Sequence, residues 1–193
     1  MRTFVYFSAS ARTSGNFDIN DLMKAGRMDI VMHVIINAFF LSHSLRDDVN
    51  LHLVFYGMPD PPKHIEINVK QETKLSKKDV AGLIKRVLYK YKPGKRTEVV
   101  PGCFIEKKAF LPVVESLKEQ GKEIFVLDKR GENIRKVNFP DNSVFVLGDH
   151  NGLPKKELKR LKKIAESVSV GNKVYFASQV ITILNHEIDM REA

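Results

Sequence analysis

Two stretches in the last third of the chain decide its fold: VFVLGDHNGLP at residues 144–154 and SVSVGNKVYFASQVITILNHEID at residues 167–189. Each begins as a short apolar run rich in β-branched residues, as expected of a strand buried on both faces. Each then passes through a glycine turn toward helix-forming sequence. The pattern predicts strands over 143–147 and 168–170 and helices over 154–165 and 175–190. Strands that alternate with helices indicate an α/β fold on a mainly parallel sheet flanked by helices.

The same alternation extends toward the N-terminus. We expect a polar loop over 8–20 and a half-exposed strand, nearer an edge of the sheet, over 65–69, where apolar and polar residues alternate. Ser76 is expected to cap the helix that follows it. The other predicted strands cover 3–7, 51–56 and 123–128, and the other predicted helices cover 28–43, 76–90 and 107–120. Without an internal repeat or a linker, the 193 residues are expected to form one domain, 1–193.

Charge and composition limit the classes of function. Lysine and arginine number 32 against 23 acidic residues, a net charge of +9 that favours binding to polyanions such as nucleic acid. A Lys- and Glu-rich surface of the thermophile type is the alternative explanation. The single cysteine, Cys103, excludes an intrachain disulfide and a cysteine-based zinc site, and the six histidines lack metal-ligand spacing, so we expect no metal.

The apolar segments are too short for a membrane protein. The first residues lack the long apolar core of a signal peptide, and the most apolar stretch, 31–41, is too short to cross a bilayer. We therefore expect a soluble, cytoplasmic protein that does not bind membranes.

Three predicted strand ends in the last third carry the first candidate site. Ligands of open α/β sheets bind beyond the carboxyl ends of strands. These ends fall at Asp128, at Gly148-Asp149 and at Gly171-Asn172, and glycine lets a ligand approach the backbone closely. Glycine also marks ordinary turns, but three such ends in succession favour a ligand site. The chain has no GxxxxGK[ST], GxGxxG, GxSxG or HExxH motif, which argues against a phosphotransferase, a dinucleotide-binding enzyme, a serine hydrolase and a zinc protease.

A second group of polar residues lies near the N-terminus. Arg27 and Asp29 open the predicted helix over 28–43. An acid in the first turn is favoured by the helix dipole, so Asp29 has a purely structural explanation as well as a functional one.

Basic residues gather in two further places. Lys92, Lys95 and Arg96 follow Tyr89 and Tyr91, a combination of charge and stacking surface that suits RNA, although a solvated helix face has a similar composition. The predicted helix over 154–165 carries six lysine and arginine residues, which we interpret mainly as solvated surface, with RNA contact as the alternative.

Together these segments resemble a known family. The two C-terminal stretches are similar to the signatures of the SPOUT methyltransferases, and FDINDLMKAGRMDIV at 17–31 with NAFFLSHSLRDDV at 37–49 narrows the resemblance to the tRNA pseudouridine-54 N1-methyltransferases of archaea. The similarity runs from Phe4 to Asp189, and GRMD, AFFLSH-x-x-R-x-D and LGDH occur in matching order.

The resemblance implies the fold, the cofactor and the partners. It implies a C-terminal deep trefoil knot over about 123–193, a rare exception to unknotted topology. It implies S-adenosylmethionine as cofactor, a homodimer with the RNA site shared between subunits, and the T-arm of tRNA as substrate. Matched residue by residue, the cofactor contacts fall on Leu127, Gly148, Val170, Gly171, Asn172, Lys173, Val174 and Tyr175, with Val180 added to the same site.

The resemblance also implies a reaction. N1 of pseudouridine carries a hydrogen, whereas N1 of uridine is bonded to ribose, so the base must already be isomerised. Asp29 is the candidate for orienting the base or accepting the N1 proton, and Arg27 for binding the base or a phosphate. Arg46, Lys92, Lys95 and Arg96 are the candidates for RNA contacts.

One position departs from the family pattern. Many relatives have cysteine where this chain has Val180, so that thiol is not an obligatory nucleophile here. Two alternatives stay open: methylation of another RNA position, such as a ribosomal pseudouridine or a ribose 2′-hydroxyl, and a non-catalytic RNA-binding protein that keeps the fold.

Overall fold

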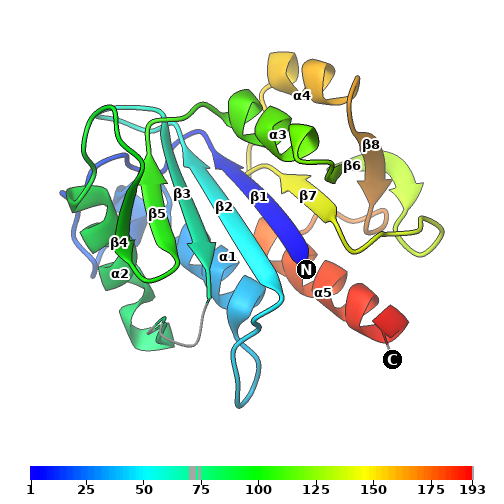
Figure 1. The fold of residues 1–193 in the computed structure, drawn as a ribbon, viewed down its shortest axis with the longest axis horizontal. Helices are drawn as coiled ribbons and strands as arrows, with labels where there is room; N and C mark the ends of the chain where they lie inside the picture. Colours follow the sequence, from blue (N-terminus) through cyan, green and yellow to red (C-terminus); the bar gives the residue numbers. More distant parts are fainter. Residues whose placement is uncertain (70–72, 74, 193) are drawn as a thin grey trace.

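The computed structural model describes residues 1–69, 73 and 75–192, and in this part of the chain eight strands form one sheet (Figure 1). Their order across the sheet is β4-β5-β3-β2-β1-β7-β6-β8. Five adjacent strands are parallel to one another: β2, β1, β7, β6 and β8. Beyond β2, the strands β3, β5 and β4 each pair antiparallel with their neighbour. The strands are β1 (Arg2–Ser8), β2 (Val49–Phe55), β3 (Lys63–Asn68), β4 (Thr97–Val100), β5 (Cys103–Glu106), β6 (Glu123–Asn133), β7 (Ser143–Leu147) and β8 (Glu166–Ser169).

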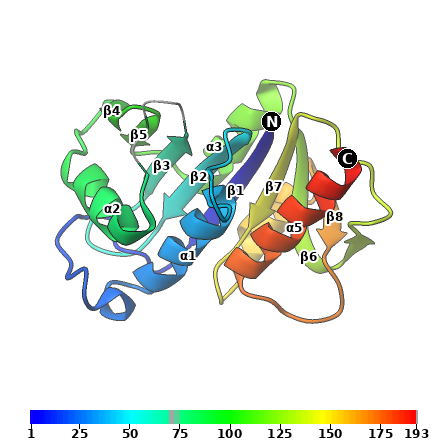
Figure 2. The ribbon, with the colours of Figure 1, turned by 90° about the horizontal axis from the view of Figure 1, so that it is seen from below.

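Helices cover both faces of the sheet (Figure 2). Side chains of α1, α2 and α5 join one buried cluster, while α3 and Leu161 of α4 join a second cluster on the opposite face. The α-helices are α1 (Met28–Phe39), α2 (Val80–Tyr89), α3 (Phe110–Glu119), α4 (Lys155–Leu161) and α5 (Ala177–Glu192), with short 3-10 helices at η1 (Leu22–Lys24) and η2 (Lys77–Asp79).

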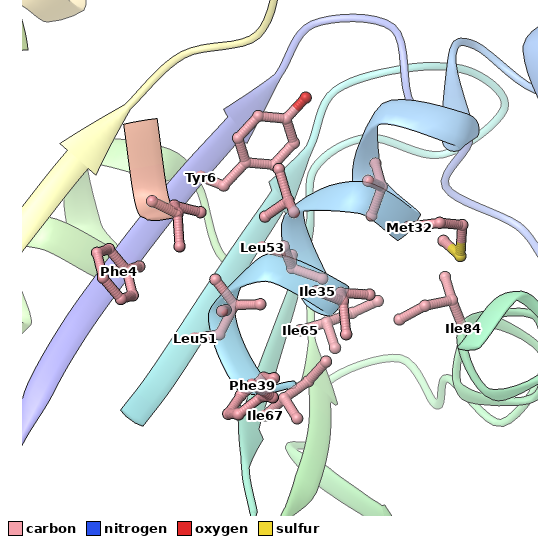
Figure 3. Close-up of a cluster of buried hydrophobic side chains, with 14 of the residues drawn as sticks. Phe4, Tyr6, Met32, Ile35, Phe39, Leu51, Leu53, Ile65, Ile67 and Ile84 are labelled. Carbon is pink, nitrogen blue, oxygen red and sulfur yellow. The ribbon is translucent and has the colours of Figure 1, made fainter. Parts of the chain in front are cut away.

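Strand β1 is the centre of the fold because both of its faces are covered. All seven residues are buried, with Phe4 and Tyr6 facing the first cluster and Val5 and Phe7 the second. Figure 3 shows the first cluster, where side chains of β1, β2 and β3 meet those of α1 and α2. This two-sided burial explains why the central strands are almost continuously apolar in sequence.

Two strands are not predicted from the sequence, and the exposure predicted for a third strand is wrong. The sequence pattern assigns no strand over 97–106, yet this segment forms the hairpin of β4 and β5 around Pro101-Gly102. Strand β3 is expected to be half-exposed, but β5 and β4 lie outside it, and Lys63 and His64 on it are buried. The Lys63 ammonium has partners there, because it forms an ion pair with Asp60 and lies 4.1 Å from the centre of the Tyr91 ring.

Several helix boundaries also differ from the predictions. Helix α1 ends at Phe39 rather than near 43, because Phe40 takes an extended backbone and bridges to Leu45. Ser76 precedes η2 and makes no side-chain cap, while α2 starts at Val80. Pro112 is accommodated because it lies in the first turn of α3, where its missing N–H is not needed. Within the described residues, no helix is both long and apolar enough to span a membrane.

Candidate functional site

A cavity of about 330 Å³ opens at the ends of β7 and β8 and beside residues 127–129 within β6. The three segments singled out in the sequence meet here, because β7, β6 and β8 are neighbours and run parallel. The predicted end of the strand at Asp128 is wrong, because β6 continues to Asn133 after its pairing register with β8 shifts between Leu127 and Glu132. The lining residues come from these strands and from the loops that follow them, and most of the walls are apolar: Leu127, Asp128, Lys129, Leu147, Gly148, Asp149, Gly152, Leu153, Leu158, Val168, Ser169, Val170, Gly171, Lys173, Val174, Tyr175, Ala177 and Val180.

Eight of the nine predicted cofactor residues line this cavity. They are Leu127, Gly148, Val170, Gly171, Lys173, Val174, Tyr175 and Val180. Asn172 is exposed in the same loop and is not among the lining residues. The residues assigned from resemblance and the strand ends assigned from the sequence pattern therefore converge on one cavity.

The loop after β7 is held in a tight turn. A Cβ atom on residue 148 would lie 2.4 Å from the carbonyl carbon of Gly152 and 2.6 Å from the amide nitrogen of Leu153, so only glycine fits. The Asp149 carboxylate accepts hydrogen bonds from the backbone N–H of Ala9, at 2.9 Å, and of Asn151, at 2.8 Å. Asp149 thus ties the cavity loop to the end of β1.

Two carboxylates in the cavity wall stand at predicted strand ends of the candidate site but are not among the predicted cofactor contacts. Asp149 is one, and Asp128 is the other; Asp128 pairs with Lys162, which lowers the pKa of its carboxyl. In the sequence they are the carboxylates of VLD and LGD at two predicted strand ends, although β6 continues past Asp128 to Asn133. That position at a strand end is the signal that could have identified them.

Arg27 and Asp29 form an ion pair at the start of α1. Arg27 Nε and one terminal guanidinium nitrogen each lie 3.0 Å from a different oxygen of the Asp29 carboxylate. The hydrogen bonds from Arg27 lower the pKa of Asp29, so the carboxylate is ionised at neutral pH. Among the described residues, Arg27 is the only non-glycine residue with a positive φ, 62°, and it is the N-cap of α1.

The buried Tyr6 is affected by the charges of this pair and by a charge in the cavity wall. Its hydroxyl points away from the hydrophobic cluster (Figure 3), and its pKa is raised, first by burial and then by the carboxylate of Asp149. The Asp29 carboxylate raises it further, and Arg27 lowers it. The loop after β1 contacts both regions: Ala9 donates a hydrogen bond to Asp149 in the cavity wall, and the Ser10 hydroxyl donates one of 3.0 Å to the carbonyl oxygen of Gly26, the residue before Arg27. Arg27 and Asp29 themselves are not among the lining residues.

The four predicted RNA contacts do not form one surface. Arg46 is largely buried, and its guanidinium pairs with Asp189 on α5. Arg96 is exposed, but it pairs with Glu66 at 2.8 Å and stacks on Phe104. Lys92 and Lys95 are exposed in the turn between α2 and β4, at the edge of the sheet opposite β8.

The six histidines fall into an exposed group and a buried group. His33, His43, His150 and His186 are exposed. His52 and His64 are buried and share a hydrogen bond of 2.9 Å, and Nδ1 of His64 lies 2.9 Å from Glu106. No group of three or more His, Cys, Asp or Glu suited to a metal occurs in the described part of the chain.

Burial of His52 predicts a pH-dependent stability. Burial, reinforced by the adjacent His64, lowers the pKa of His52 far below its ordinary value of 6.5. Below pH 6.5 the unfolded chain therefore binds a proton at His52 that the folded chain does not. The free energy of unfolding should fall between pH 7 and pH 5, by up to about 1.4 kcal/mol per pH unit from this group. Urea unfolding of the wild type and of His52→Asn between pH 7 and pH 5 measures this change in the free energy of unfolding. If the free energy fell equally with pH in both proteins, His52 would not be its source.

Known proteins are similar to this chain along nearly its whole length. The family model described as "Putative SAM-dependent RNA methyltransferase" matches residues 1–193. The chain is 38% identical to the tRNA (pseudouridine(54)-N(1))-methyltransferase of Thermococcus gammatolerans, covering 98% of this chain and 97% of that one. It is 36% identical to the enzyme of the same name from Methanocella arvoryzae, covering 99% and 100%.

Solved structures agree on the fold. Nep1 of Archaeoglobus fulgidus, in its complex with S-adenosylhomocysteine, superposes with a TM-score of 0.64 at 16% identity over 100% of this chain and 99% of that one. A protein from a study of 2-OH methylation of C/U34 on tRNA superposes with a TM-score of 0.52 at 14% identity, covering 99% of this chain and 91% of that one. From the match to the family model and the identity to these relatives, the chain belongs to the S-adenosylmethionine-dependent RNA methyltransferase family.

Proposed function

We propose that this protein methylates N1 of pseudouridine at position 54 of tRNA, with S-adenosylmethionine as cofactor. The observation that carries the proposal is the cavity at β6, β7 and β8, which is lined by eight of the nine cofactor residues expected from the family. The Arg27–Asp29 pair is connected to its wall through the loop after β1. The relatives that match almost the entire chain bear the name of this activity.

The cavity fits the proposed cofactor in shape and in chemistry. Its apolar walls, among them Leu127, Leu153 and Val168, suit the faces of an adenine ring. Backbone groups at Gly148 are free of any side chain, and the carboxylates of Asp128 and Asp149 complement hydroxyl groups and positive charge. When bound, the cofactor supplies an electrophilic methyl group and an excellent leaving group.

The residues of the chain itself have to orient the base and manage one proton. The target base lies within the folded T-loop and has to be extruded to enter the site. The N1–H of pseudouridine is a hydrogen-bond donor, and the Asp29 carboxylate has lone pairs beyond those used by Arg27. Because Arg27 lowers the pKa of Asp29, we expect Asp29 to act first by orienting N1–H, with the proton passing onward toward solvent as the methyl group transfers.

The backbone at Arg27 supports a functional role for this pair. A non-glycine residue in the left-handed region costs about 1 kcal/mol or more, and such strain clusters at functional sites. Arg27 combines this backbone conformation with the ion pair to Asp29. A purely structural helix start needs no such conformation.

Valine at position 180 is compatible with turnover. Val180 lines the cavity with an inert side chain, and transfer by direct attack needs positioning rather than a protein nucleophile. We expect Val180→Cys to change kcat by less than about threefold, since the two side chains are of similar size. Methyl transfer to tRNA by the two proteins measures this, and a rise of tenfold or more in the variant would indicate a role for the thiol.

Calorimetric titration with S-adenosylmethionine tests the proposal against a non-catalytic RNA-binding protein. Binding that saturates at micromolar cofactor, together with transfer of labelled methyl to tRNA, is the expected result. Absence of binding at high micromolar cofactor would favour the non-catalytic alternative. A methyl group found on ribose or on another base would favour the second alternative.

We also infer a knot over about 123–193, one domain over 1–193, a homodimer and a cytoplasmic location shared with the tRNA substrate. The C-terminal helix supports the knot, because Arg191 on α5 donates hydrogen bonds to the carbonyl oxygens of Ile134 and Val137 in the β6–β7 connection. The exposed Val174 and Phe176 beside the cavity support a second subunit at this edge. Size-exclusion chromatography with light scattering tests the dimer, and a stable monomer would contradict it.

A further inference from the structure

A strongly charged surface borders the cavity at α4. Lys155, Lys156, Lys159 and Arg160 on the helix and Lys163 just after it are exposed, and none of them has a carboxylate partner among the described residues. Lys129 and Lys173, which line the cavity, continue the surface and are likewise unpaired within the described part of the chain. We call these seven residues the α4 surface.

The α4 surface is fixed to the cavity wall. Leu158 of the same helix lines the cavity, and Leu161 is buried in the second hydrophobic cluster. Lys162 pairs with Asp128, a further lining residue. The helix therefore holds its cations in a defined position relative to the site of methyl transfer.

The fold gains little from these charges. Lys155 and Lys156 occupy the first turn of α4, where the positive end of the helix dipole disfavours cations. Close, unpaired cations also repel one another, and α4 carries a single carboxylate, Glu157. A polyanion removes this repulsion when it binds.

We propose that the α4 surface binds the phosphate backbone of the RNA substrate and orients it toward the cavity. This inference rests on the proposed function, because the adjoining cavity is what makes RNA the expected polyanion. A membrane fits α4 less well, since its two apolar residues are Leu158, which lines the cavity, and Leu161, which is buried in the second hydrophobic cluster. On this proposal the main RNA contact lies beside the cavity and not at the turn between α2 and β4, which is at the far edge of the sheet (Figure 1).

The test compares two double variants that each remove two exposed positive charges. Lys155→Ala/Lys159→Ala changes the α4 surface, and Lys78→Ala/Lys118→Ala is the matched control on η2 and α3. Alanine keeps the helix propensity of lysine, so both variants should fold. Binding of fluorescently labelled tRNA is measured by anisotropy across a range of salt concentrations, without methyl donor.

We expect the α4 variant to weaken tRNA binding about tenfold or more near 0.1 M salt and to reduce the slope of log K against log salt by about 2. The KM for tRNA should rise in parallel, while the affinity for S-adenosylmethionine and the kcat at saturating tRNA stay unchanged. A loss of binding no larger than that of the control would overturn the inference. Because binding is measured without methyl donor, failure of the proposed reaction appears only in the transfer assay and is distinguished from failure of this surface.

Discussion

Replacement of Asp29 by alanine is expected to lower the kcat for methyl transfer by about 100-fold or more, the range typical of a positioned group that handles a proton. In the wild type, two hydrogen bonds from Arg27 hold this carboxylate in one orientation and keep it ionised. Alanine removes the acceptor for N1–H and leaves the guanidinium without its partner. Single-turnover transfer of labelled methyl to tRNA measures the effect.

Two controls separate this loss from general damage. Asp21→Ala removes an exposed carboxylate that pairs with the exposed Lys24, and it should leave turnover unchanged. Asp29→Asn keeps an acceptor oxygen but loses the charge, so its kcat for methyl transfer should lie between those of Asp29→Ala and the wild type. Full turnover of Asp29→Ala, with normal cofactor affinity in all variants, would remove Asp29 from the mechanism.

The second large effect is expected at Gly148. In Gly148→Ala the new Cβ would meet the backbone of Gly152 and Leu153 at 2.4–2.6 Å, so the loop has to move away from the cavity. We expect the affinity for S-adenosylmethionine to fall about 100-fold or more, because a displaced loop loses its contacts with the ligand and alters the cavity. Calorimetric titration measures this fall.

The matched control is Gly121→Ala in the turn between α3 and β6. Gly121 has a φ of +79°, but a Cβ atom at this position would meet open space, so alanine there strains the backbone without touching the cavity. Both variants should lose stability, and thermal unfolding reports that loss. If Gly148→Ala bound the cofactor as tightly as Gly121→Ala, the loop after β7 would have no part in the cofactor site.

The parallel half of the sheet is predictable because its signals are local. Val144, Val146 and Val168 stand in short β-branched runs that end in glycine, and burial on both faces requires such runs. The order of these strands then brings their ends together, so the cavity follows from the strand ends. The antiparallel side is less predictable, because the hairpin over 97–106 has short strands whose pairing depends on the partner β3.

Charged residues are harder to predict than the cavity because their role depends on contacts distant in sequence. Arg46 and Asp189 are far apart along the chain, and only the packing of α5 brings them together. The same holds for Arg96 with Glu66 and for Asp149 with Ala9. Conversely, the sequence favours solvated surface for the lysines of α4, and their position beside the cavity is visible only in the structure.

The most direct test of the proposed reaction uses two matched T-arm RNAs that differ only at position 54, one with pseudouridine and one with uridine. Both are incubated with the wild-type protein and labelled S-adenosylmethionine, and the methylated nucleoside is identified by mass spectrometry. The predicted result is transfer to the pseudouridine RNA alone, with the methyl group on the base, because only pseudouridine has a hydrogen at N1. Equal transfer to both RNAs would contradict N1 of pseudouridine as the nucleophile.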